Sequence, residues 1–72
     1  MMKITCLGDA HFPGYSWKNY RVETDTEFIV VAARDPQEAS DIAESPHTWK
    51  ADGGYHFTDE NGVKHPAYGT LP

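Results

Sequence analysis

Residues 28–33 read Phe-Ile-Val-Val-Ala-Ala, an unbroken apolar run that constrains the fold more than any other part of the sequence. Side chains alternate between the two faces of a β-strand, so both faces of this segment are apolar. A strand of that kind is typical of a central position in a sheet that is covered on both sides. The sequence therefore predicts a central strand here, with a separate cover for each face.

A helix start follows this strand directly. Asp35 can accept hydrogen bonds from the free N–H groups of a first helical turn, and Pro36 suits the first helical position. Glu38 completes a capping box and complements the positive end of the helix dipole. Because Pro46 disfavours helical geometry at the residue before it, we expect the helix to end at about Glu44.

The predicted helix is amphipathic. Ala39, Ile42 and Ala43 form its apolar stripe, and the small alanines would let it lie close to a sheet. The acidic side chains lie away from this stripe: Asp35, Glu38, Asp41 and Glu44. Such an acidic surface could contact a basic groove on another molecule, and an ordinary solvated helix face is the alternative interpretation.

Alternating patterns predict two strands before the central one. Met2–Leu7 alternates apolar and polar residues, which places Cys6 on the buried side, and Tyr20–Thr24 alternates in the same way. The polar segment 24–27 can turn the chain into the central strand. A single long strand that bends near Asp25 is the alternative.

A hairpin is predicted after the helix. Its arms are Tyr55–Thr58 and Val63–Tyr68, joined through Asn61 and Gly62, which favour the positive φ angles of a tight turn. Because Pro66 has no N–H group to donate, the last strand should lie at an edge or end early. Thr48–Ala51 is a further candidate for a short strand.

These elements predict one domain over residues 1–72, with an α+β fold. We expect a small, mostly antiparallel sheet of four to five strands with one short α-helix packed on one face, in the order β-β-β-α-β-β. One more short strand is left open. With only 72 residues, the chain has a modest core and little room for a deep, preorganised pocket.

The second face of the central strand needs a cover that one short helix cannot provide. The aromatic loop containing Phe12, Tyr15 and Trp17 is one candidate, and the segment around Trp49 is another. A second protein is the third, and a homodimer through the sheet would meet the same need. Either tryptophan could anchor a partner.

The charge balance restricts the class of partner. Eleven acidic residues against six Lys and Arg give a net charge of −5, which disfavours direct binding to nucleic acid and favours basic protein surfaces. The single cysteine excludes an intrachain disulfide. Together with the absence of a long apolar run or a signal peptide, it predicts a cytoplasmic protein outside the membrane.

Two patterns raise the possibility of metal chemistry. Met2-Lys3-Ile4 with Asp9 and His11 resembles the opening of calcineurin-like metallophosphoesterases, in which an Asp-x-His motif at a strand end binds a catalytic metal. The family's later motifs are missing, and the chain is too short for its α/β sandwich. A small metal-binding protein or phosphoesterase fragment using Asp9 and His11 therefore stands as an alternative function.

The histidines give a second, weaker pattern. His47, His56 and His65 are nine residues apart, whereas zinc ligands are normally paired two to five residues apart. A hairpin could bring His56 and His65 together across Asn61 and Gly62. Hydrogen-bonded or solvated histidines are the preferred interpretation, and we predict no cofactor.

The layout resembles small virus-encoded defence inhibitors, such as anti-CRISPR proteins. The likeness is carried by residues 28–33 running into Asp35-Pro36-Gln37-Glu38-Ala39, a strand, cap and helix that span about a quarter of the chain. It implies inhibition by occluding a surface of a host nucleic-acid-handling or defence complex, and it transfers no functional residue. We therefore predict a non-enzymatic protein-binding module, with a structural or assembly subunit as a further alternative. The predicted partner-binding residues are Asp35, Glu38, Asp41, Glu44, Trp17 and Trp49.

Overall fold

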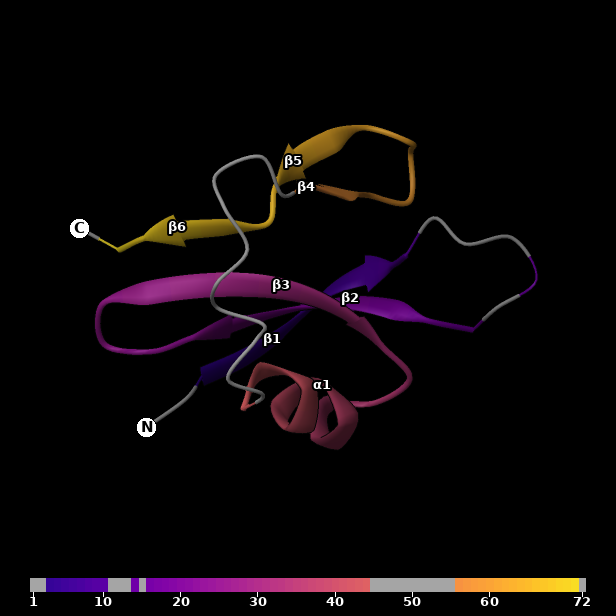
Figure 1. The fold of residues 1–72 in the computed structure, drawn as a ribbon. Helices are drawn as coiled ribbons and strands as arrows, with labels where there is room; N and C mark the ends of the chain where they lie inside the picture. Colours follow the sequence, from indigo (N-terminus) through magenta and orange to yellow (C-terminus); the bar gives the residue numbers. More distant parts are fainter. Residues whose placement is uncertain (1–2, 11–13, 15, 45–55, 72) are drawn as a thin grey trace.

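The structure is a computed structural model of the chain, and it describes residues 3–10, 14, 16–44 and 56–71. Figure 1 shows a sheet with a helix on one side and a hairpin on the other. The elements in chain order are β1 (Lys3–Asp9), β2 (Lys18–Glu23), β3 (Glu27–Ala33), α1 (Pro36–Ala43), β4 (His56–Thr58), β5 (Lys64–Pro66) and β6 (Tyr68–Thr70). The predicted α+β class and the order β-β-β-α-β-β are confirmed.

The main sheet is antiparallel, with the strand order β1-β2-β3-β6, and β4 and β5 pair separately as a hairpin. β3 lies between β2 and β6, so the prediction of a central strand is confirmed. The second arm of the predicted hairpin, Val63–Tyr68, is divided in the structure. β5 ends at Pro66, as expected for a residue without an N–H group, and Tyr68 starts a separate strand on β3.

The helix forms as its start signals predict. The Asp35 carboxylate accepts a hydrogen bond from the Glu38 N–H at 2.8 Å, and Pro36 occupies the first turn. The Glu38 carboxylate turns back to Arg34, accepting from its backbone N–H at 3.1 Å and from its guanidinium at 2.7 and 2.9 Å. α1 ends at Ala43 with Glu44 as its C-cap, within one residue of the predicted end.

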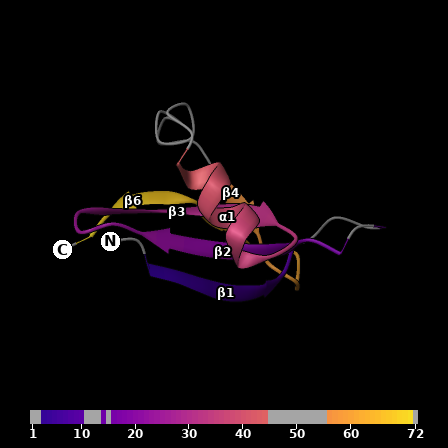
Figure 2. The ribbon, with the colours of Figure 1, turned by 90° about the horizontal axis from the view of Figure 1, so that it is seen from below.

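One core lies between the helix and the sheet, and Figure 2 shows α1 crossing the face of β2 and β3. This helix-side core consists of Tyr20, Val22, Ile29, Val31, Ala33, Ala39 and Ala43. Ile42 and Ile4 pack against it and are half-buried. The predicted apolar stripe of the helix is therefore confirmed.

The prediction that Cys6 is buried is wrong. Cys6 points to the same side of the sheet as buried Tyr20, its partner on β2, yet it is exposed. The reason is its position on an outermost strand. The buried helix residues Ala39 and Ala43 join a core drawn from β2 and β3, and the side chain of Cys6 lies beyond that cover.

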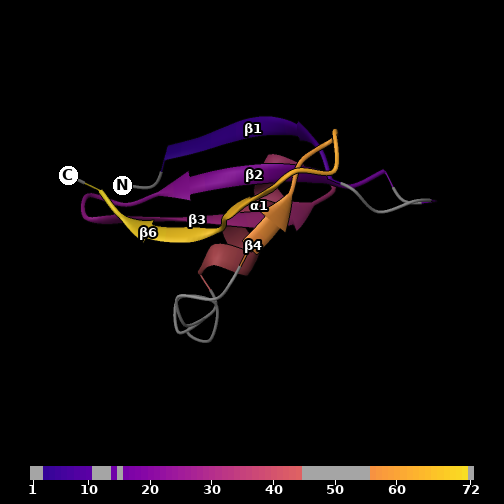
Figure 3. The ribbon, with the colours of Figure 1, turned by 90° about the horizontal axis from the view of Figure 1, so that it is seen from above.

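The opposite face of β3 is covered by the β4–β5 hairpin, which Figure 3 shows on the side away from α1. Val30 on this face is only 2% exposed. The Arg21 guanidinium stacks on the Phe28 ring at 4.0 Å, and the Asn19 side-chain amide donates to the Thr58 carbonyl at 2.9 Å. Both faces of β3 are thus covered within one chain, which removes the need for a homodimer there.

In two turns of the chain, polar side chains accept hydrogen bonds from backbone N–H groups. The Thr24 hydroxyl oxygen accepts hydrogen bonds from the N–H groups of Thr26 and Glu27, which confirms a turn rather than one long bent strand. In the β4–β5 turn, the Asp59 carboxylate accepts from the Asn61 and Val63 N–H groups, both at 2.9 Å. Here only Gly62 has a positive φ, of 82°.

Several predictions concern residues that the structure does not describe. They are the strand at Thr48–Ala51 and the cover by Phe12, Tyr15 or the Trp49 segment. Among the described residues, no helix combines the length and the apolar character needed to span a bilayer.

Candidate functional site

The acidic residues of α1 differ in how far the fold already uses them. Asp35 caps the helix, and Glu38 forms an ion pair with Arg34 at 2.7 Å. The Arg34 hydrogen bonds hold the pKa of Glu38 below its usual value. Asp41 accepts a hydrogen bond from the Gln37 amide at 3.1 Å, and Glu44 is exposed at the end of the helix. The predicted acidic stripe therefore exists, but Arg34 neutralises its first turn.

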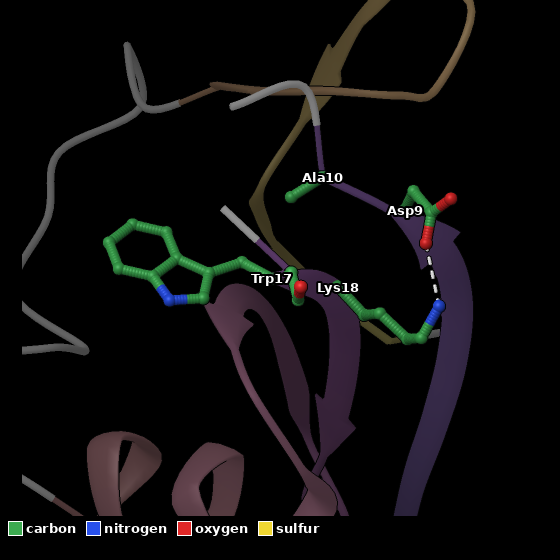
Figure 4. A pocket seen from close by; sticks show the side chains of 5 residues that line it. Asp9, Ala10, Trp17 and Lys18 are labelled. Carbon is green, nitrogen blue, oxygen red and sulfur yellow. Dashed lines mark hydrogen bonds and ion pairs between the residues drawn. The ribbon is translucent and has the colours of Figure 1, made fainter. Parts of the chain in front are cut away.

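Trp17 lies beside an open hollow of about 410 Å³, shown in Figure 4. Its lining includes Asp9, Ala10, Ser16 and Lys18. Asp9 and Lys18 face each other across β1 and β2 and form an ion pair of 2.6 Å, which raises the pKa of Lys18. The indole points away from this pair (Figure 4) and is half-buried. Trp17 is thus a partly available apolar surface, while Trp49, the other predicted anchor, lies outside the described residues.

The residues predicted for metal binding do not form a site in the described part of the chain. The Asp9 carboxylate is occupied by Lys18, and His11 and His47 are not among the described residues. In the hairpin, His65 lies opposite Phe57 and His56 lies opposite Pro66. Because neighbouring strand residues point to opposite faces, the two histidines are not brought together. Within the described ranges there is no group of three or more metal-ligating side chains.

His65 has a structural role in the hairpin. Its Nε2 lies 2.7 Å from Oδ2 of Asp59, and its ring stacks on Phe57 with the centroids 5.1 Å apart. The hydrogen bond to His65, followed by those from Val63 and Asn61, holds the pKa of Asp59 below its usual value. The interpretation of this residue as a hydrogen-bonded histidine is confirmed.

A groove of about 260 Å³ runs between the hairpin and the sheet. We call it the hairpin groove; its lining is Leu7, Arg21, Phe28, Val30, Phe57, His65 and Pro66. The Arg21 Nε lies 3.1 Å from a Glu23 carboxylate oxygen, an ion pair whose geometry does not make a hydrogen bond. This groove has no signal in the sequence, because its residues come from five separate strands and its Arg–Phe contact has no signature of local spacing.

The outer edge of β1 is a second feature that the alternating sequence pattern does not indicate. β1 ends the sheet, and no described strand pairs with its outer side (Figures 2 and 3). Leu7 is 43% exposed and Cys6 is exposed, so the edge carries apolar side chains. The pairing with β2 shifts between Cys6 and Gly8, a bulge at which Gly8 has a φ of 113°. Gly8 in the sequence was the available signal for this bulge.

Among the described residues, a larger share of the basic side chains than of the acidic side chains forms ion pairs. Lys18, Arg21 and Arg34 each pair with an acid, which leaves Lys3 and Lys64 as the unpaired lysines of the described residues. Five exposed acids of the same ranges have no ion pair: Asp25, Asp35, Asp41, Glu44 and Glu60. The described surface therefore has an excess of acids without ion-pair partners.

Comparison with known proteins adds no family to this description. The sequence matches no protein-family model, and no curated protein or solved structure matches it significantly.

Proposed function

We propose that this chain is a small, acidic, non-enzymatic protein-binding module that occludes a basic surface of its partner. The observation that supports this proposal is the acidic excess of the described surface. Three of its five acids without an ion pair lie on α1 or at its ends: Asp41, the N-cap Asp35 and the C-cap Glu44. A cluster of like charge accelerates encounter with an oppositely charged surface and selects against acidic partners.

The partner class follows from this charge. Proteins that handle nucleic acids have basic channels, and an acidic module can compete with the phosphate backbone for them. The proposed role is that of a virus-encoded inhibitor acting in the host cytoplasm on a nucleic-acid-handling or defence complex. Inhibition of this kind is stoichiometric, because it depends on occupying a surface and not on turnover.

Charge reversal on α1 tests whether its acidic residues bind the partner. Asp41→Lys with Glu44→Lys reverses two exposed charges and leaves both the Asp35 cap and the Arg34–Glu38 pair intact. Asp25→Lys with Thr26→Lys and Thr70→Lys is the matched control, since it makes the same change in net charge at exposed residues away from α1 and from Glu60. Each protein is used for affinity capture from a nuclease-treated host lysate.

We expect the original chain and the control to capture the same basic nucleic-acid-handling protein, and the helix variant to lose it. Raising the salt concentration should weaken capture by the original chain, because exposed charges are screened. Equal capture by all three proteins would overturn the proposed role of α1. Capture restricted to acidic proteins would overturn the proposed class of partner.

A further inference from the structure

The peptide groups along β1 alternate in direction, and the register shows which of them face outward. The Thr24 N–H donates to the Glu27 carbonyl, so these two residues form a hydrogen-bonded pair between β2 and β3. Such pairs recur at every second position, which turns the peptide groups of Arg21 and Glu23 away from β3 and toward β1. The Val30 N–H donates to the Ala67 carbonyl, on the side of β3 away from β2, which agrees with this alternation.

The same alternation continues into β1. Thr5 and Lys3 lie opposite Arg21 and Glu23, so their peptide groups face β2. The N–H and C=O groups of Ile4 and Cys6 therefore face outward. In the described part of the chain no strand receives them, and a row of such groups is a template for an added strand.

A second copy of the chain fits this template poorly. A two-fold pairing about Thr5 would match outward-facing Ile4 with Cys6 of the copy, but it would place Lys3 opposite Leu7 and bring together two chains of net charge −5. A two-fold pairing about Cys6 would match Lys3 with Asp9. It would also place outward-facing Ile4 opposite Gly8, whose peptide faces Asn19 on β2.

A basic segment fits better, because an acid without an ion pair, Glu60, lies where β1 ends. Asp9, in its ion pair with Lys18, closes the strand, and the Glu60 carboxylate reaches from the hairpin turn to Gly8: a Cβ atom there would lie 3.4 Å from Oε2 of Glu60. Both acids are exposed. Between these acids and Lys3, the edge offers the apolar side chains of Ile4, Cys6 and Leu7.

We propose that β1 accepts an extended, lysine- or arginine-rich segment of a partner protein as a fifth strand of the sheet. The proposal rests on the proposed function and specifies how the partner is held. The outward groups of Ile4 and Cys6 bind the backbone of the segment, its apolar residues contact the β1 side chains, and a basic residue lies beside Glu60. Backbone pairing supplies affinity, and the flanking charges supply the preference for a basic sequence.

The probe is a capped eight-residue peptide in which valine and lysine alternate. Amide hydrogen exchange in the chain alone and with the peptide reports on each position of β1. With the peptide at ten times its Kd, exchange at Ile4 and Cys6 should slow about tenfold, since only the unbound fraction exchanges. Thr5, already bonded to β2, should change little. Two control peptides should have no such effect: one with glutamate for lysine and one with N-methylated valines.

A pair of variants tests the role of the backbone directly. Cys6→Pro removes one outward N–H group and leaves the bonds to β2 in place, a substitution that edge strands tolerate. Cys6→Val keeps the N–H group. We expect the valine variant to bind the peptide and the proline variant to bind it at least about tenfold more weakly, since proline removes a hydrogen bond from a short ladder.

Three results would overturn the added strand: equal binding by the two variants, slowing confined to α1, or slowing at Ile4 and Cys6 that depends only on the concentration of the chain itself. The last result would assign the edge to a second copy. Loss of partner capture by the helix variant together with unaltered capture by Cys6→Pro would leave the proposed function standing and remove only this inference.

Discussion

The two faces of β3 are both closed, but by different chemistry. On the helix side, Ile29 and Val31 meet alanines of α1 in a core of apolar side chains and the Tyr20 ring. On the hairpin side, Val30 is as well buried, yet its surroundings include Arg21 and His65 together with aromatic rings. One cover follows immediately in sequence, and the other comes from residues 56–66. An apolar run therefore predicts that both faces are covered without revealing what covers each one.

The largest expected effect comes from shortening one buried side chain on each face of β3 and comparing the losses of stability. Ile29→Ala should lower the free energy of unfolding by about 2–5 kcal/mol, because it opens a cavity in the helix-side core. Val30→Ala removes less apolar volume beside a groove and should cost about 1.5–3 kcal/mol. Urea unfolding of both variants measures the difference. A greater loss for Val30→Ala would contradict the assignment of the main core to the helix side.

The second-largest expected effect concerns the close packing of Gly69 against the Phe28 ring on the hairpin side of β3. A Cβ atom on Gly69 would lie 2.7 Å from Cε1 of Phe28, the ring on which Arg21 stacks. Gly69→Ala should therefore destabilise the chain by about 1–3 kcal/mol through overpacking. Phe28→Leu in the same chain should recover part of the loss, and a double-mutant cycle measures this coupling. Fully additive effects would mean that the Phe28 ring and Gly69 are not in contact.

A smaller effect is confined to the helix side. Asp35→Ala removes the hydrogen bond to the Glu38 N–H and should cost about 0.5–2 kcal/mol. Asp41→Ala is the matched control on the same helix, because Asp41 caps nothing, and it should change stability by less than about 0.5 kcal/mol. Thermal unfolding followed by circular dichroism measures both. Equal losses would contradict the capping role of Asp35.

The smallest effect is a pH dependence in the hairpin. The pKa of Asp59 is lower in the folded chain than its usual value of 3.8, because His65 and two backbone N–H groups bind its carboxylate. Its contribution to stability is therefore complete above that value and is lost as the pH falls through the folded pKa. Asp59→Asn keeps an acceptor for the N–H groups but no charge. Its melting temperature should fall less than that of the original chain between pH 5 and pH 2, and equal falls would exclude this contribution.

Local signals in the sequence were enough for the strand β3, the cap and the helix, since each depends on neighbouring residues. Asp35, Pro36 and Glu38 set the helix start in both sequence and structure. The pairing of segments that are far apart in the sequence could not be predicted from local signals. Pro66 predicted where β5 ends, but nothing local indicated that Tyr68–Thr70 pairs with β3 or that the hairpin folds over Val30. The exposure of Cys6 likewise depends on strand order, which alternation alone does not specify.

Amide hydrogen exchange along β1 in the isolated chain tests most directly whether this edge is open. If the outer side of β1 is free, Thr5 is protected by its bonds to β2, while Ile4 and Cys6 exchange much faster at every protein concentration. Protection of Ile4 and Cys6 equal to that of Thr5 would mean that something already occupies the edge, and the account of β1 as an open docking strand would be wrong.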